Sequence, residues 1–212
     1  MRLLELFKGT GSISKVFEKN GWECITLDID PKWSPTHCCD IMDFDYKQYP
    51  PSYFDMVHCS PPCQFFSCAR NIYINRFGHT KESLYNDILE KGLPPLIQSL
   101  KIIQYFQPAV FTIENPSSGK MKDFLDLPFS DCSYCSYGFL YRKNTRFWNN
   151  IGLKLEKCKC KGMHPSSIMG NNSIPTSKQE RVKNNLARLY AIPQPLCESI
   201  YEQVMKYLAD PK

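Results

Sequence analysis

The sequence lacks any apolar run of the roughly 18 residues that a membrane-spanning helix needs. Its first residues, MRLLELF, also lack the basic start, apolar stretch and small-residue cleavage site of a secretory signal. We therefore expect an intracellular protein, cytoplasmic or nuclear, that is not held in a membrane. There is no internal repeat, low-complexity tract or interdomain linker, and 212 residues are enough for one sizeable domain.

Net charge and cysteine content bear on two questions: whether the protein binds a polyanion, and whether its thiols are paired in disulfides. The net charge of +5 is mild, so it permits a polyanionic partner without demanding one. The eleven cysteines are a high and odd count. Without a secretory signal, such a count favours free thiols, a metal site or a nucleophile over a disulfide framework.

Short β-type runs alternate with helical stretches through the first half of the chain. Strands are expected over 2–7, 23–30, 54–60 and 109–116, a glycine-opened turn and amphipathic helix over 8–21, and a further helix over 93–106. Beyond Pro128 an aromatic β-type segment, a basic loop-like segment and two closing helices follow. This order predicts an α/β domain with a mostly parallel sheet.

A Gly-x-Gly turn lies between the first expected strand and the first expected helix. Gly9 and Gly11 permit a tight turn and close approach of a ligand, although Ser14 stands where a dinucleotide-binding pattern has its third glycine. Asp28 and Asp30 end the second strand, where a carboxylate can accept hydrogen bonds from ribose hydroxyls. The turn alone is more typical of a plain strand–helix connection, but with these acids it favours an adenosine-type cofactor.

A cysteine and a glutamate follow two further strands. Cys63 comes after Pro61-Pro62, which fix the backbone at the carboxyl end of the third strong strand. A thiol held there can act as a nucleophile if its surroundings favour the thiolate, whereas most of the other cysteines are expected to be buried filler. Glu114, in Glu-Asn-Pro, ends the strand over 109–116 and faces the same crevice if the two strands are neighbours. The alternative for Glu114 is an ordinary strand-ending turn.

Together these segments resemble the cytosine-C5 DNA methyltransferases. The matching pieces are ELFKGTGS, LDID, CDI, SPPCQFFS and IENP, in the order of the family, over about residues 1–116. The resemblance implies a Rossmann-like S-adenosylmethionine-dependent methyltransferase fold with a mixed, mostly parallel seven-stranded sheet and a small C-terminal recognition extension. It implies that Cys63 attacks C6 of a cytosine flipped out of duplex DNA while Glu114 assists protonation at N3.

The resemblance also assigns the remaining site residues. Asn115 would brace the cysteine loop, and Gln64 and Arg142 would contact the substrate. The loop over 67–92, with Arg70, Arg76 and Lys81, would meet DNA phosphates, a solvated basic loop being the alternative. The residues implied for S-adenosylmethionine are Phe7, Gly9, Gly11, Asp28, Ile29, Asp40, Ile41 and Pro62.

Three departures from the family pattern qualify these assignments. The family's Gln-x-Arg-x-Arg strand is best matched by residues 142–146, so Arg146, on one strand face with Arg142, becomes the candidate for orienting the glutamate. Tyr190 replaces an asparagine of the closing motif. Only about 35 residues separate Arg146 from Arg181, too few for a full recognition domain. Specificity is then expected to be short and relaxed, or supplied by a partner protein.

The domain organisation expected on this basis is a single C5-methyltransferase domain over 1–212. Residues 1–130 would form the cofactor-binding and catalytic core, 131–180 a reduced target recognition region, and 181–212 the closing helices.

The reduced recognition region also contains potential zinc ligands. Four of these could close a tetrahedral site that fastens a loop too small for its own core, the alternative being ordinary buried or surface thiols. The ligand candidates are Cys132, Cys135, Cys158, Cys160 and His164.

Two other functions remain open from sequence. A small recognition region is compatible with an RNA (tRNA) cytosine-5 methyltransferase. The altered closing motif and missing recognition domain are compatible with a non-catalytic nucleic-acid-binding or partner subunit of the same fold. The intact Cys63 and Glu114 favour the DNA-methylating enzyme over both.

Overall fold

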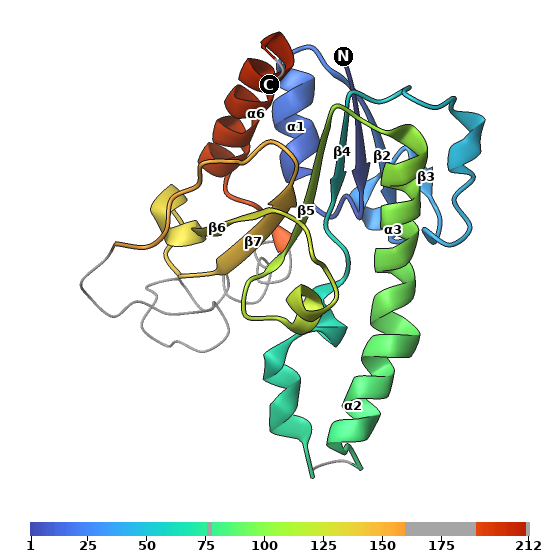
Figure 1. Ribbon diagram of the computed structural model, residues 1–212, viewed down its shortest axis with the longest axis vertical. Coiled ribbons are helices and arrows are strands. Elements are labelled where there is room, and N and C mark those ends of the chain that lie inside the picture. Colours follow the sequence, from blue (N-terminus) through green and yellow to red (C-terminus); the bar gives the residue numbers. More distant parts are fainter. Residues whose placement is uncertain (76–77, 160–189, 211–212) are drawn as a thin grey trace.

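The computed structural model describes residues 1–75, 78–159 and 190–210 (Figure 1). The strands are β1 (Arg2–Leu6), β2 (Glu23–Asp28), β3 (His37–Cys38), β4 (Met56–Cys59), β5 (Val110–Pro116), β6 (Phe129–Ser133) and β7 (Asn144–Asn149). The α-helices are α1 (Ser12–Lys19), α2 (Lys81–Asp87), α3 (Leu93–Phe106) and α6 (Gln194–Ala209). Shorter helical turns are η1 (Pro31–Trp33), η2 (Tyr46–Gln48), η3 (Cys63–Phe65), η4 (Cys68–Tyr73), η5 (Ile88–Gly92), η6 (Lys120–Asp123) and η7 (Tyr134–Tyr137).

One mixed seven-stranded sheet organises the chain, in the order β3-β2-β1-β4-β5-β7-β6. Strands β1 to β5 pair in parallel, while β7 runs antiparallel to both β5 and β6. The predicted α/β class and mixed, mostly parallel sheet are confirmed. Strands β6 and β7 complete this sheet, so residues 129–149 are part of the core rather than a separate recognition module.

Apolar side chains on alternate strand positions bury both faces of the sheet. Leu4 and Leu6 of β1 lie in one core cluster, whereas Leu3 lies in the other. Helix α3 covers the first face and helices α1 and α6 cover the second, giving three layers (Figure 1). The helical residues that supply these layers are Leu96, Ile102 and Phe106 on one side, and Ile13, Val16, Phe17, Leu196, Ile200 and Val204 on the other.

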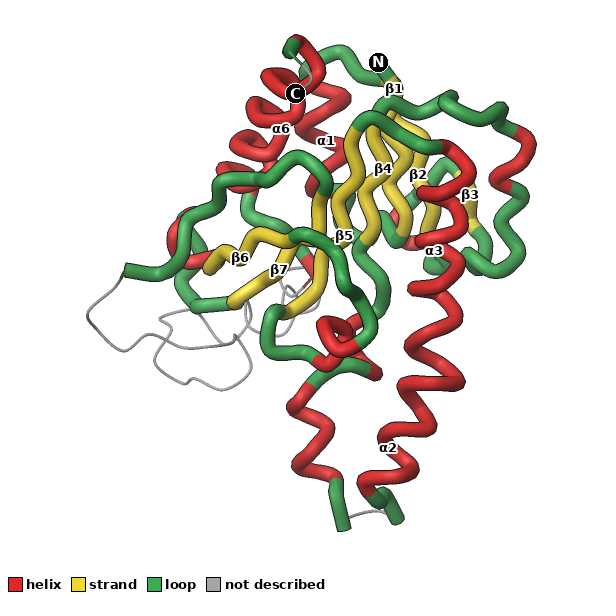
Figure 2. The backbone as a smooth tube through the Cα atoms, in the orientation of Figure 1, coloured by secondary structure: helices red, strands yellow, loops and turns green. Residues whose placement is uncertain are grey.

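The segment after the Pro-Pro-Cys turn projects from the body as two neighbouring arms (Figures 1 and 2). Sequence periodicity gave no structure for residues 67–92, but the described part is helical: η4 on one arm, α2 and η5 on the other. Arg70 and Asp87 form an ion pair between the arms. At Gly92 an added Cβ would lie 3.1 Å from Phe66 Cζ, so the missing side chain lets η5 approach the cysteine turn.

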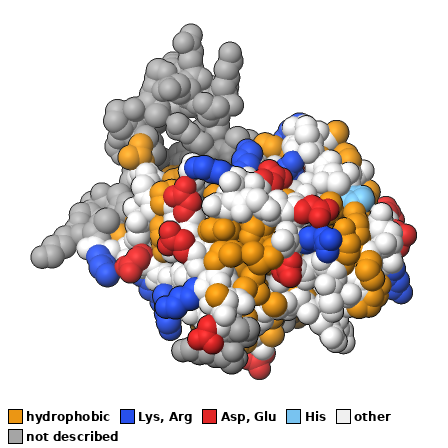
Figure 3. Space-filling view, turned by 90° about the horizontal axis from the view of Figure 1, so that it is seen from above, with side chains coloured by type: hydrophobic (Ala, Val, Ile, Leu, Met, Phe, Trp, Pro, Cys, Tyr) orange, Lys and Arg blue, Asp and Glu red, His pale blue; other side chains and the backbone are white. Residues whose placement is uncertain are grey.

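Both described ends of the chain lie at the amino-terminal side of the parallel strands (Figure 1). Seen from that side, basic and acidic side chains are interspersed around apolar ones (Figure 3). Among the described residues, no helix has the length and apolar character to cross a membrane.

Candidate active site

The strand order reverses between β1 and β4, because β2 and β3 follow on one side of β1 and β5 on the other side of β4. In open parallel sheets, ligands bind at such a switch point, outside the carboxyl ends of the strands. The glycine turn follows β1 and the Pro-Pro-Cys turn follows β4. Both sequence-predicted motifs therefore meet at one edge.

The turn after β1 has an unusual backbone. Phe7, Gly9 and Gly11 all have positive φ, at 61°, 50° and 65°, and a positive φ is uncommon for a phenylalanine. The Gly9 N–H donates to Asp28 Oδ2 at 2.7 Å, and the Asp30 N–H donates to Oδ1 of the same carboxylate at 2.9 Å. Asp28 therefore fastens the glycine turn to the end of β2.

The remaining predicted cofactor residues lie at the same strand ends. Asp28 pairs with Cys38 in the sheet register, so Asp40 and Ile41 follow β3 beside the end of β2. Ile29 is 66% exposed, whereas Ile41 is 4% exposed and belongs to the core. Asp40 is exposed and accepts a hydrogen bond from the Met42 N–H at 2.9 Å.

These groups fit an adenosine-containing cofactor. Each oxygen of the Asp28 carboxylate can accept a further hydrogen bond in addition to its backbone donor. The exposed Ile29 side chain offers an apolar surface, and Asp40 a second acceptor. An apolar surface flanked by acceptors suits the base and hydroxyls of adenosine.

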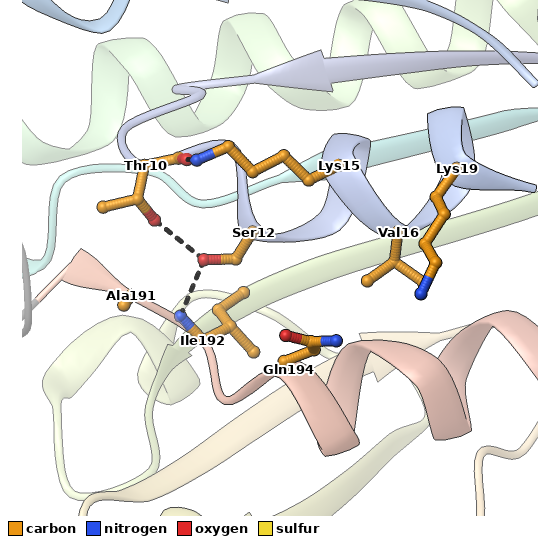
Figure 4. A pocket seen from close by; sticks show the side chains of 8 residues that line it. All are labelled: Thr10, Ser12, Lys15, Val16, Lys19, Ala191, Ile192 and Gln194. Carbon is orange, nitrogen blue, oxygen red and sulfur yellow. Dashed lines mark hydrogen bonds between the residues drawn. The ribbon is translucent and has the colours of Figure 1, made fainter.

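The glycine turn is also fastened to the start of α6. Ser12 Oγ lies 2.7 Å from Thr10 Oγ1 and accepts a hydrogen bond from the Ile192 N–H at 3.1 Å (Figure 4). An open pocket of about 380 Å³ lies here, lined by Thr10, Ser12, Lys15, Val16, Lys19, Ala191, Ile192 and Gln194. Tyr190, at the position of the expected asparagine, is 54% exposed, and its ring packs edge-on against Trp33.

Several contacts hold the cysteine turn in place. Cys63 begins η3 directly after Pro62. Asn115 Nδ2 donates to the Pro61 carbonyl at 2.9 Å, which ties the turn to β5. The Lys120 N–H donates to the Phe66 carbonyl at 2.8 Å. Gln64 is exposed beside the half-buried Cys63.

Cys63 and Glu114 lie close enough to interact electrostatically. Strands β4 and β5 are neighbours, with Cys59 opposite Ile113. Burial raises the pKa of the Cys63 thiol, the negative charge of Glu114 raises it further, and the positive charge of Lys143 opposes both. Glu114 is 7% exposed, and its Oε1 accepts a hydrogen bond from the Tyr134 hydroxyl at 3.2 Å.

A buried histidine links β4, which leads into the cysteine turn, with β5, which carries Glu114. His58 of β4 lies opposite Thr112 of β5. Its Nδ1 is 2.7 Å from Thr112 Oγ1 and its Nε2 is 3.0 Å from Ser60 Oγ. Burial lowers the pKa of His58 from its ordinary 6.5 to about 3, so the ring is neutral and offers one donor and one acceptor. It connects Ser60, three residues before Cys63, with Thr112, two residues before Glu114.

The pKa of His58 predicts an acid-dependent loss of stability. In the unfolded chain the imidazole binds a proton near pH 6.5, but in the folded protein only near pH 3. The free energy of unfolding should therefore fall as the pH drops from 6.5 towards 3, by at most about 5 kcal/mol from this group. His58→Gln should remove this part of the loss in urea denaturation.

His37→Gln is the matched control, because His37 lies on the outer strand β3. The free energy of unfolding of this variant should vary with pH as that of the wild type does. Parallel pH profiles for wild type and His58→Gln would contradict the assignment.

Arg146 does not approach Glu114. In the register of β5 and β7, Glu114 is opposite Phe147, and Arg146 is opposite Asn115. Alternation therefore directs Arg146 to the other face of the sheet from Glu114. There its Nε donates to Asp131 Oδ1 at 2.7 Å and its guanidinium lies 3.5 Å from the Phe129 ring centre. Arg142, two positions from Asn144, is exposed before β7.

Three residues around Glu114 and Cys63 were not identified from sequence: His58, Tyr134 and Lys143. His58 stands out only as a polar residue in an otherwise apolar strand. Lys143 lies inside the segment matched to the family's arginine strand, but strand alternation puts it on the opposite face from Arg142 and Arg146, the predicted candidates. Tyr134 belongs to η7 and gave no signal beyond the aromatic character of its segment.

The predicted zinc ligands are only partly described. Cys132 is buried in the core, and burial raises the pKa of its thiol to about 12, which disfavours the thiolate that zinc binds. Cys135 and Cys158 are half-buried, while Cys160 and His164 lie outside the described residues. Within the described part of the chain, no group of three or more potential ligands is arranged for a metal ion. Zinc stays a prediction from spacing.

Comparison with known proteins identifies a family that this chain matches. The family model for C-5 cytosine-specific DNA methylases matches residues 1–122. A probable DNA (cytosine-5)-methyltransferase of frog virus 3 (isolate Goorha) is 38% identical over 183 residues, which cover 84% of this chain and 80% of that protein.

Solved structures were also matched. The structure of a DNA modification methyltransferase encoded within an Escherichia coli prophage has a TM-score of 0.47 at 18% identity over 70% of this chain. The Entamoeba histolytica methyltransferase EhMeth has a TM-score of 0.49 at 16% identity over 75% of this chain. The chain spans 46% and 57% of the lengths of these two solved proteins.

Proposed function

Because the chain belongs to the C-5 cytosine-specific DNA methylase family, we propose that it transfers a methyl group from S-adenosylmethionine to C5 of cytosine in DNA, with Cys63 and Glu114 as its catalytic residues. One observation supports Cys63 and Glu114 as the catalytic residues. Cys63 lies in the turn after β4 and Glu114 near the end of the adjacent parallel strand β5, close enough for the charge of Glu114 to raise the pKa of the Cys63 thiol.

Cytosine C5 is a poor nucleophile until the conjugation of the ring is broken, and the two side chains fit that requirement. Glu114, whose negative charge opposes the Cys63 thiolate in the free site, takes up a proton from solvent as the base binds. Cys63, as thiolate, then forms a bond to C6 while Glu114 gives that proton to N3. C5 thereby becomes nucleophilic. S-adenosylmethionine, when bound, supplies the electrophilic methyl group. After C5 gives its proton to a water molecule, the C6–sulfur bond breaks, Cys63 leaves as thiolate and Glu114 recovers the N3 proton.

The target atom is inaccessible in a stacked duplex, so the cytosine must be flipped into the site. The turn that contains Cys63 is fixed on one side at Pro61 and on the other at Phe66, which keeps the thiol at the sheet edge when the base enters. We propose that the exposed Gln64, beside Cys63, contacts the substrate. Arg70 is already paired with Asp87, so a contact of Arg70 with phosphate would compete with this ion pair.

For the cofactor we propose the residues that follow β1, β2 and β3. Asp28 holds the glycine turn and accepts from the ribose, Ile29 packs on the adenine, and Asp40 accepts from its exocyclic amine. Phe7, Gly9 and Gly11 shape the turn, and Ile41 and Pro62 complete the surroundings.

Asp28→Ala should weaken binding of S-adenosylmethionine by about 10- to 100-fold, because the variant loses the acceptor of the Gly9 and Asp30 N–H groups together with the ribose contact. Isothermal titration calorimetry measures the dissociation constant. Asp45→Ala removes an exposed carboxylate from the loop after β3 and should bind as wild type does. Equal affinities for wild type and Asp28→Ala would contradict the proposed cofactor site.

The domain organisation is likewise proposed from the family: one C5-methyltransferase domain whose recognition region lies after β7. Target specificity is then short, or supplied by a partner protein.

The function is tested by methyl transfer from labelled S-adenosylmethionine to duplex DNA and, in parallel, to tRNA. Label at C5 of DNA cytosine is expected. Label on tRNA alone would replace the proposal by the RNA-methylating alternative. Absence of label from both, for a folded protein that binds S-adenosylmethionine, would favour the non-catalytic alternative.

A further inference from the structure

The strand register determines which cation faces the catalytic pair. Residues directly opposite in an antiparallel ladder share a face, and Glu114 is opposite Phe147. Alternation along β7 and its preceding residue then puts Lys143 and Thr145 on the same side as Glu114. Arg146 is on the other side, where it pairs with Asp131.

Lys143 contacts the site through two neighbours. Its Nζ lies 3.9 Å from Glu114 Oε1 and 4.8 Å from the centre of the Tyr134 ring. The Tyr134 hydroxyl donates to the same Glu114 oxygen at 3.2 Å, and the Tyr134 N–H donates to the Lys143 carbonyl at 3.0 Å. One carboxylate oxygen is thus held by a hydroxyl and faced by an ammonium group.

Both charged side chains are also largely buried, which strengthens the electrostatic interaction between them. The side chain of Lys143 is 21% exposed and that of Glu114 is 9% exposed. Interactions between charges are less screened in such surroundings than in water. The groups that face Glu114 are Cys63 from the turn after β4, Cys132 from β6, Tyr134 from η7 and Lys143.

Lys143 acts on the nucleophile as well as on the carboxylate. Burial and the negative charge of Glu114 both raise the pKa of the Cys63 thiol, and Lys143 lowers it. Cys63 must be a thiolate to attack C6, yet its partner carboxylate opposes that state. The positive charge of Lys143, close to both groups, favours the Cys63 thiolate and so offsets part of the effect of Glu114.

We propose that Lys143 is the positioning residue of this active site, holding Glu114 together with Tyr134 and offsetting the charge of Glu114 beside Cys63. This rests on the proposed function in that it takes Cys63 as nucleophile and Glu114 as proton donor. It replaces Arg146 and Arg142 in the role of orienting the glutamate. Lys143 needs no contact with the base to act in this way.

The electrostatic part is tested without any substrate. Cys63 is alkylated with iodoacetamide over a range of pH, and its peptide is quantified by mass spectrometry, because only the thiolate reacts. At pH 8, Lys143→Met should slow alkylation of Cys63 by about 3- to 10-fold, the effect of a pKa increase of half a unit to one unit. Lys143→Arg should react nearly as wild type, and Glu114→Gln should react faster.

Two controls separate this effect from a general loss of positive charge. Lys206→Met removes an exposed cation from α6, and Arg142→Met removes an exposed cation that is adjacent to Lys143 in sequence and precedes β7. Both should leave the alkylation rate of Cys63 unchanged. An unchanged rate in Lys143→Met, or an equal slowing in Arg142→Met, would overturn the proposal.

Single-turnover and steady-state methylation then separate this inference from the function. Lys143→Met should lower kcat and move its pH profile to higher pH with little change in KM for DNA, and Lys143→Arg should restore it. If wild type methylates and Lys143→Met does so equally well, the inference fails while the function stands. If wild type does not methylate, the proposed function fails, and the alkylation rates still decide whether Lys143 offsets the charge at Cys63.

Discussion

Cys63→Ala should abolish methyl transfer to DNA, with a loss of at least about 10³-fold that reflects removal of the covalent step. Without the thiolate, nothing in the site adds to C6, and C5 stays too weak a nucleophile to accept the methyl group. Cys63 is half-buried at the surface of the turn, so an alanine leaves the turn's backbone contacts at Pro61 and Phe66 intact.

The measurement is incorporation of labelled methyl groups into duplex DNA, with S-adenosylmethionine affinity as a check that the fold survives. Cys68→Ala is the matched control. That thiol is exposed five positions further on, at the start of η4, and donates to the Ser118 carbonyl at 2.7 Å. Substantial activity in Cys63→Ala, or an equal loss in Cys68→Ala, would show that the nucleophile lies elsewhere.

Glu114→Gln should lower the rate of methyl transfer by about 10²- to 10⁴-fold, the usual contribution of a positioned acid. A glutamine has nearly the same shape and can still accept from the Tyr134 hydroxyl, but it has no proton to give to N3. Addition of sulfur to C6 then leaves unneutralised negative charge on the ring. Binding of DNA and of S-adenosylmethionine should change little.

Single-turnover kinetics with saturating DNA isolates this chemical step. Glu156→Gln, an exposed glutamate beyond β7, is the control and should react as wild type. The same variant separates two roles of Glu114, because it should slow methylation while it speeds alkylation of Cys63. A Glu114→Gln variant that methylates at the wild-type rate would remove Glu114 from the mechanism.

Elements with strong local patterns could be predicted from the sequence. The helix expected over 93–106 is α3 with the same bounds, and the strands expected over 2–7 and 109–116 are β1 and β5. In these segments apolar residues repeat with the period of the element and turn residues mark the ends. The glycine turn and the Pro-Pro-Cys turn were therefore attached to the correct strand ends.

The cation beside Glu114 could not be predicted, because it depends on the pairing of two strands distant in sequence. Residues 142–146 contain three cations, and a shift of one residue exchanges the face that each occupies. Only the pairing of Glu114 with Phe147 selects Lys143 over Arg142 and Arg146. The helical arms over 67–92 escaped prediction for a related reason, since η5 is fixed by packing of Gly92 on Phe66 rather than by its own periodicity.

The most direct test of the central claim is to trap the bond between Cys63 and the base. Wild-type protein is incubated with S-adenosylmethionine and duplex DNA in which 5-fluorocytosine replaces cytosine, digested, and analysed by mass spectrometry. Fluorine at C5 cannot leave as a proton does, so the C6–sulfur bond should persist, and the adduct should map to the peptide containing Cys63 and disappear in Cys63→Ala. A protein that methylates ordinary DNA but forms no such adduct, or forms it at another cysteine, would contradict the account.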